Sequence, residues 1–112
     1  MAKMGTDNLI VEISGFLNIC ATGRKILDIL EISKRGLLVS EIIERTKRSE
    51  RAVRTHLKLL LQLRLIRRKK VVTKKKKLAY RYLALRAHEL IRSTKKEMRR
   101  RLRRLEAHIL RA

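Results

Sequence analysis

The sequence predicts a mostly α-helical protein with one small β-hairpin, and three stretches of the chain carry this prediction. Two short amphipathic helices separated by a basic turn lie within residues 39–66. Residues 65–83 are rich in β-branched, aromatic and basic side chains, and residues 84–111 contain nothing that breaks a helix. This order predicts a winged helix-turn-helix, placed between an N-terminal helix and a long C-terminal helix.

The first helix is predicted over residues 7–19, where apolar side chains recur at helical spacing. Thr6 or Asp7 is available to cap its beginning, because short polar side chains accept hydrogen bonds from the free N–H groups of a first turn. Thr22 and Gly23 are expected to end this helix and to open the next one.

A second helix is predicted over residues 24–34, again from the spacing of its apolar side chains. Gly36 is expected to terminate it in the left-handed conformation that glycine adopts without steric cost. Leu37 and Leu38 are then expected to form a very short strand. The residues of this helix that are available for the core are Ile26, Leu27, Leu30 and Ile32.

The helix-turn-helix is predicted over residues 40–46 and 49–63, joined by a basic turn at residues 46–48. Ser40 and Ser49 stand where helix caps are expected. The apolar residues of the second helix recur at helical spacing, which places them on one buried face. The residues predicted to face the core are Ile42, Ile43, Val53, Leu57 and Leu60.

The opposite face of the second helix is predicted to contact duplex DNA. Arg51 and Arg54 lie in its first two turns, where arginine can bond guanine in bidentate fashion. The helix N-terminus also favours a phosphate oxygen, because its free N–H groups and its dipole are positive. Glu50 either accepts a hydrogen bond from cytosine or stabilises the helix dipole, and His56 is expected to pack beside the core. The DNA-binding residues assigned in this region are Lys47, Arg48, Ser49, Arg51, Arg54, Thr55 and Lys58.

A basic β-hairpin is predicted next, with residues 65–73 as its outgoing strand and residues 78–83 as its returning strand. Residues 74–77 are four lysines without a tight-turn dipeptide, so we expect a loose, mobile tip. The hairpin is expected to reach the flanking backbone or minor groove, and its lysines also discourage edge-to-edge aggregation. Its assigned DNA contacts, beside Arg67 at its base, are Arg68, Lys69, Lys70, Lys74, Lys75, Lys76 and Lys77.

A C-terminal helix is predicted over residues 84–111, about 42 Å long at 1.5 Å per residue. Its apolar residues alternate as in a heptad seam, and one helix cannot bury so narrow a stripe alone. We therefore predict a homodimer, with residues 1–83 as the DNA-binding domain and residues 84–112 as the dimerisation helix. The alternative is a monomer that folds this helix back on its own core. The seam residues are Ile91, Met98, Leu102, Leu105 and Ile109.

The charge of the chain is strongly asymmetric. The formal net charge is +21, and nearly all of the excess falls after residue 50. Such an excess repels itself unless a polyanion neutralises it, which favours a nucleic acid partner over an anionic membrane. The arginine-rich run of residues 95–104 is expected to make extra DNA contacts or to contact the acidic half of a partner subunit; the alternative is a solvated face.

Composition argues against several other functions. Aromatic residues are only 3% of the chain, too few for base stacking on a sheet. No nucleophile motif or phosphate-binding loop is present, so we expect no enzyme activity, cofactor or small-molecule ligand. Cys20 is expected to be buried, with an intermolecular disulfide or a redox sensor as the alternatives. His88 and His108 lack metal-binding neighbours. Without an apolar span or signal peptide, the protein is expected to be cytoplasmic and nucleoid-associated.

Three parts of the chain resemble small archaeal winged-helix DNA-binding proteins, in particular TrmB-like and Lrs-like regulators. They are residues 40–66 (SEIIERTKRSERAVRTHLKLLLQLRLI), residues 78–85 (LAYRYLAL) and the long final helix, so the resemblance covers about residues 22–111. It implies a homodimer paired through the terminal helix that acts as a repressor or as an abundant chromatin protein. The chain lacks the sugar-binding domain of full-length TrmB regulators, and its hairpin tip lacks their usual Gly and Pro.

The predicted function is therefore sequence-tolerant binding of duplex DNA by a homodimer, as a transcription regulator or a nucleoid-associated protein. One alternative is an RNA-binding or ribosome-associated winged-helix protein, because a lysine-rich hairpin would serve A-form RNA equally well. Another is a protein-interaction adaptor that uses only the helical seam.

Overall fold

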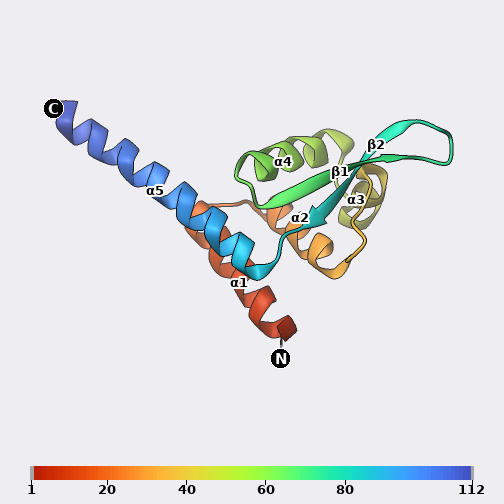
Figure 1. The fold of residues 1–112 in the computed structure, drawn as a ribbon, viewed down its shortest axis with the longest axis horizontal. Coiled ribbons are helices and arrows are strands. Elements are labelled where there is room, and N and C mark those ends of the chain that lie inside the picture. Colours follow the sequence, from red (N-terminus) through yellow and green to blue (C-terminus); the bar gives the residue numbers. More distant parts are fainter. Residues whose placement is uncertain (1, 112) are drawn as a thin grey trace.

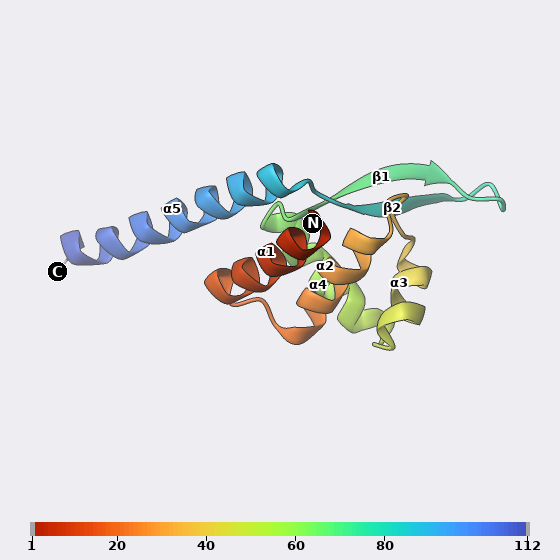
Figure 2. The same cartoon turned by 90° about the horizontal axis from the view of Figure 1, so that it is seen from below.

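Residues 2–111, the part of the chain that the computed structural model describes, with side chains from residue 8 onward, form five helices and one two-stranded antiparallel sheet. In chain order the elements are α1 (Ala2–Leu17), α2 (Ala21–Ile32), α3 (Val39–Thr46), α4 (Glu50–Gln62), β1 (Ile66–Val72), β2 (Leu78–Ala84) and α5 (Ala87–Arg111). Figures 1 and 2 show α2–α4 and the hairpin gathered in one body, with α1 beside the first half of α5 and the end of α5 projecting away. This is the predicted winged helix-turn-helix with its long C-terminal helix.

Helix α1 begins and ends earlier than predicted. It already includes Thr6 and Asp7, so the predicted cap at these residues is wrong. Its last residue precedes Asn18, which has a φ of 56°, a left-handed conformation that asparagine tolerates better than most residues. The Ile19 N–H then donates to the Ser14 carbonyl at 2.9 Å, which closes the helix end.

Helix α2 also starts before its predicted beginning, so Thr22 and Gly23 are helical and do not end α1. It ends before Ser33, and Gly36, with a φ of 83°, closes the following turn by donating its N–H to the Ser33 carbonyl at 3.1 Å. Glycine is needed at this turn because an added Cβ would lie 2.8 Å from the Tyr82 carbonyl oxygen. The left-handed residue was therefore predicted correctly, but it follows the helix end by several residues.

Helices α3 and α4 form the helix-turn-helix with bounds close to the prediction, and one of the two predicted caps is wrong. Ser40 lies inside α3, and the Leu38 N–H at the helix start donates instead to Glu41 Oε1 at 2.8 Å. A glutamate three residues into a helix can reach back in this way, so the helix begins earlier than the serine suggested. Ser49 does cap α4, because its side chain accepts from the Ala52 N–H at 3.1 Å.

The hairpin strands β1 and β2 pair in continuous register over their whole length. The very short strand before α3 is also present, as an isolated bridge between Leu37 and Tyr82. The tip is a closed turn, whereas a loose loop was predicted: Lys76 is left-handed, and its N–H donates to the Thr73 carbonyl at 2.8 Å. The Thr73 N–H donates in turn to the Lys77 carbonyl at 2.9 Å, so the tip needs no glycine to form.

The hydrophobic core lies between α1, α2, α3, α4 and the inner part of the hairpin. Most of the predicted core residues are buried, and Ile43 is half-buried. Ile32 is a wrong prediction, because it lies in the last turn of α2 and is 76% exposed. Among the residues whose side chains the structure describes, the largest fully buried ones are Ile26, Leu30, Ile42, Thr46, Val53, Leu57, Leu60 and Leu65.

Helix α5 begins at Ala87, later than predicted, because residue 84 still belongs to β2. Its first half packs against α1, where Leu90 is buried in the core. Its second half extends into solvent, as both ribbon views show (Figures 1 and 2). None of the helices within residues 2–111 is long and apolar enough to cross a membrane.

Candidate nucleic-acid interface

The exposed face of α4 and the turn before it hold the residues that the sequence assigned to DNA. Every one of the seven assigned residues between Lys47 and Lys58 is exposed. Lys47 is left-handed, with a φ of 59°, and it turns the chain between α3 and α4. The Ser49 cap then fixes the start of α4, so that Arg51 and Arg54 project from its first turns.

Two polar side chains on this face already have partners within α4. Glu50 Oε2 accepts a hydrogen bond from Arg54 Nε at 2.9 Å, in an exposed ion pair one helical turn long. Thr55 Oγ1 donates to the Arg51 carbonyl at 2.8 Å. The spacing of four residues between Glu50 and Arg54 is a signal for this pair that the sequence-based interpretation overlooked. Because the pair is exposed, it contributes at most about 1 kcal/mol to stability. It therefore orients the Arg54 side chain but leaves it available to bind a ligand.

A groove of about 470 Å³ runs between α4 and the hairpin. Arg54 and Lys58 line it from α4, and Arg68 lines it from β1. The Arg68 guanidinium carbon lies 4.2 Å from the centre of the Tyr80 ring, a cation–π contact that orients the side chain. The structure therefore brings predicted residues of the helix and of the hairpin to two sides of one basic groove.

The predicted residues of β1 divide between the two faces of the hairpin. Because successive side chains of a strand alternate, Arg68 and Lys70 share the sheet face of Tyr82, whereas Lys69 lies on the other face. The four tip lysines, residues 74–77, are exposed at the far end of the hairpin (Figure 1). Only part of the basic strand therefore lies on the side of the groove.

A further basic residue of the hairpin, Arg81, was not singled out in the sequence. Its Nη1 donates to the Gly36 carbonyl at 3.2 Å and lies 3.8 Å from Glu41 Oε1. Because these partners lie before and within α3, Arg81 ties the returning strand to the helix-turn-helix. No local spacing could have revealed this contact, since the residues it joins are far apart in the chain.

The cysteine and the histidines form no metal site within the described side chains. Cys20 is exposed, which corrects the expectation of a buried thiol; it lies at the start of α2, after the end of α1. Its Sγ lies 3.5 Å from Nδ1 of His56, which is half-buried on α4 as expected for a structural histidine. His88 and His108 are exposed on α5.

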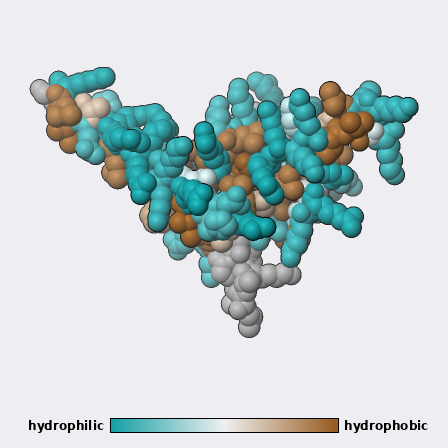
Figure 3. Space-filling view, viewed as in Figure 1, coloured by the Kyte–Doolittle hydropathy of each residue, from teal (hydrophilic) through white to brown (hydrophobic). Residues whose placement is uncertain are grey.

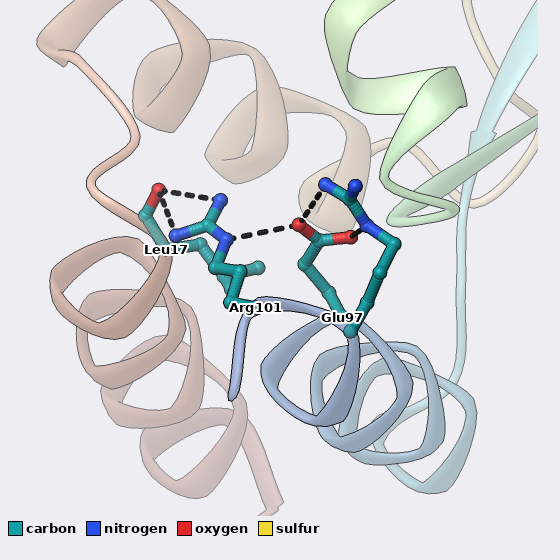
Figure 4. A network of polar contacts seen from close by, with 4 residues as sticks. Leu17, Glu97 and Arg101 are labelled. Atoms are coloured by element: carbon teal, nitrogen blue, oxygen red, sulfur yellow. Dashed lines mark hydrogen bonds and ion pairs between the residues drawn. The ribbon is translucent and has the colours of Figure 1, made fainter. Parts of the chain in front are cut away.

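A charged network joins α5 to the end of α1 (Figure 4). The Glu97 carboxylate accepts from Nε and Nη2 of Arg100 at 2.9 and 2.7 Å, and from Nε of Arg101 at 2.9 Å. Arg101 also donates to the Leu17 carbonyl at 3.4 Å through Nη2. The hydrogen bonds, chiefly that from Arg100, lower the pKa of Glu97 to about 2, although burial opposes this shift. Part of the arginine-rich run thus has an anionic partner inside the chain.

The predicted seam of α5 is largely uncovered in the single chain. Leu102, Leu105 and Ile109 are 54%, 61% and 75% exposed. Nearer the middle of α5, an apolar groove of about 450 Å³ runs along the junction of α5 and α1, and Phe16 and Met98 are among its lining residues. Figure 3 shows apolar side chains at the surface of the free end of α5. An exposed apolar surface of this kind is typical of a site that a partner covers.

Several solved structures share this fold. A possible transcriptional regulator from Methanosarcina mazei Go1 has a TM-score of 0.68 and 14% identity, over 88% of this chain and 83% of that chain. The S. aureus MepR–DNA complex has a TM-score of 0.58 and 16% identity, over 99% and 91% of the two chains. YusO from Bacillus subtilis has a TM-score of 0.53 and 23% identity, over 98% and 81%. At these identities the likenesses show the fold alone.

No protein-family model matches the sequence, and no curated protein is similar to it in sequence. The likeness to known proteins is therefore one of three-dimensional fold.

Proposed function

We propose that this protein binds duplex DNA as a homodimer and regulates transcription or coats the nucleoid, with weak sequence preference. The observation that carries the proposal is the basic groove between α4 and the hairpin, with Arg54, Lys58 and Arg68 on its sides. The first turns of α4 enter the major groove, where Arg51 and Arg54 reach base edges, and the hairpin follows the flanking backbone. The MepR structure with DNA, which shares the fold, supports this arrangement.

The homodimer is proposed from the uncovered seam of α5. Leu102, Leu105 and Ile109 are more than half exposed in the single chain, and apolar area removed from water stabilises an interface by roughly 25 cal/mol per Å². A second copy of the same helix offers a matching stripe, as in a coiled coil. The dimer would also contain two α4 helices, so that it could engage two half-sites on the duplex.

Weak sequence preference is proposed from the balance of the contacts. The tip lysines and the hairpin arginines are suited to phosphates, which carry no sequence information directly, whereas Arg51 and Arg54 alone are placed for base edges. With a net charge of +21, phosphate contacts would dominate the affinity. Each such contact contributes roughly 0.9 to the slope of log affinity against log salt, so binding should weaken steeply with salt.

The test compares two variants on a selected duplex and on a scrambled duplex, by fluorescence anisotropy over a salt series. Arg51→Ala/Arg54→Ala should reduce the discrimination between the duplexes, by about 1–3 kcal/mol for each base that the variant no longer reads. Replacing residues 74–77 by alanine should weaken both duplexes alike and lower the salt slope by up to about 3.6. Equal effects of the two variants on discrimination would mean that α4 reads no bases.

The same assay separates the remaining candidates. Tighter binding of duplex RNA than of duplex DNA at one salt concentration would favour the RNA-binding alternative. A slope of log affinity against log salt that corresponds to only one or two phosphate contacts would exclude DNA coating. In cells, a few sharp peaks of genome occupancy would indicate a local regulator, and broad coverage would indicate a nucleoid protein.

The resemblance to TrmB-like and Lrs-like archaeal proteins, carried by residues 40–66 and 78–85, is part of this proposal. No catalytic, cofactor or ligand-sensing role is proposed.

A further inference from the structure

A second basic groove, of about 240 Å³, lies where the C-terminal end of α4 meets α5. Four of its lining side chains are cationic, and only Glu97 is anionic. The Glu97 carboxylate is already bonded to Arg100 and Arg101, so it offsets only part of this charge. Most of the lining groups are hydrogen-bond donors suited to an anion: Gln62, Arg64, Ser93, Lys96, Arg100 and Arg103.

This second groove continues the exposed face of α4. Gln62 lines both the second groove and the groove between α4 and the hairpin. It follows Arg51 by 11 residues on α4, which is about 16 Å at 1.5 Å per residue. The major groove of B-DNA is about 12 Å wide. Where α4 crosses the major groove, its last turn therefore lies over the sugar–phosphate backbone that borders the groove.

We propose that the second groove binds the phosphodiester backbone of the same duplex, through Lys96, Arg100 and Arg103 of α5 together with Arg64. This inference rests on the proposed DNA-binding function and extends the interface to α5. The groove, of about 240 Å³, is large enough for a phosphate group and ordered waters. The Glu97 carboxylate orients the Arg100 guanidinium beforehand by a two-point contact, which limits the entropy cost of binding.

The second groove stays open in the proposed homodimer. At about 100° per residue, Lys96, Arg100 and Arg103 lie roughly half a turn around α5 from the seam. Pairing of two α5 helices through the seam therefore leaves the cationic face of each helix in solvent. One helix then serves two interfaces, with an apolar face toward the second copy and a cationic face toward the duplex.

The experiment compares two double variants that remove the same charge. Lys96→Gln/Arg103→Gln changes two exposed side chains of the second groove and leaves the hydrogen bonds of Glu97 in place. The control, Lys25→Gln/Arg35→Gln, changes exposed side chains on and after α2 that line neither basic groove. Because the net charge of the two variants is equal, any difference between them reports local contacts.

Binding of a fluorescent duplex is measured over a salt series, and the oligomeric state of each variant by sedimentation. The groove variant should bind about tenfold more weakly than the control at low salt, with a log–log salt slope lower by about 1.8 and an unchanged oligomeric state. Should the double variant fail to fold, Arg103→Glu compared with Arg35→Glu gives the same contrast. Equal affinity and slope for groove and control variants would overturn the inference while leaving DNA binding intact. A wild-type protein that does not bind duplex DNA would overturn the proposed function as well.

Discussion

Helices α4 and α5 are both amphipathic, but only α4 buries its whole apolar face within its own chain. Val53, Leu57 and Leu60 of α4 are at most 2% exposed, whereas Leu102 and Leu105 of α5 are more than half exposed. The difference lies in their neighbours, since α4 packs against α2, α3 and β1 and only the first half of α5 packs, against α1. Periodic apolar residues thus mark a face that needs a cover, and the fold decides whether the same chain supplies it.

The largest effect is expected when the proposed contact between the α5 helices of two copies is disrupted. Leu102→Glu/Leu105→Glu places carboxylates in the seam, so the proposed dimer should dissociate into monomers. Loss of the second DNA-binding unit should lower affinity for a two-half-site duplex by about 10²- to 10⁴-fold, because binding to the second half-site is no longer intramolecular. Sedimentation equilibrium and duplex titration measure the two effects.

The control for this prediction is Ile32→Glu/Leu110→Glu, which introduces the same charges at exposed apolar residues outside the seam. It should leave the oligomeric state unchanged and weaken DNA binding only through its charge. A seam variant that remains as dimeric as this control would show that α5 is not covered by a second copy.

A smaller effect is expected when the cover of α4 is tested by a matched pair of adjacent leucines. Leu60→Ala removes a fully buried side chain and should lower the free energy of unfolding by about 2–5 kcal/mol. Leu59→Ala, at a residue that is 43% exposed on the same helix, should cost less than about 1 kcal/mol. Urea denaturation followed by circular dichroism measures both, and similar losses would contradict the contrast between the two faces of α4.

The smallest effect concerns the network that holds the packed half of α5 to α1. Glu97→Gln should lower the free energy of unfolding at pH 7 by about 1–2 kcal/mol, because the partner arginines are partly exposed and solvent screens them. The pKa of Glu97 is lowered from 4.5 to about 2, so its stabilising effect is complete above pH 4.5 and is lost as the pH falls toward 2. Denaturation at pH 7 and at pH 3 should show that the difference in the free energy of unfolding between wild type and variant becomes smaller in acid.

Glu106→Gln provides the comparison for this prediction, since Glu106 is an exposed carboxylate on the projecting half of α5. Its replacement should change stability by no more than about 0.5 kcal/mol. A gap between wild type and Glu97→Gln that persists unchanged at low pH would mean that the carboxylate charge is not what stabilises the junction.

Local sequence was enough to locate the elements of this fold and most of its buried residues. The helical spacing of Val53, Leu57 and Leu60 predicted one face correctly, and Ser49 marked the start of α4, because periodicity and capping depend on residues a few positions apart. The element ends were less predictable. Ser40 had the chemistry of a cap but lies inside α3, because the helix begins at Val39 and the Glu41 carboxylate accepts from the Leu38 N–H at its start.

The meeting of distant residues depended on packing that no local pattern encodes. Arg54 and Arg68 line one groove because α4 and the hairpin dock on the same core, and Arg64 meets Arg103 because α5 passes the end of α4. The exposure of Cys20 likewise follows from where α1 ends and α2 begins. Hydrogen bonding and burial along a helix repeat within a few residues, whereas contacts between helices depend on how all of the apolar faces are buried at once.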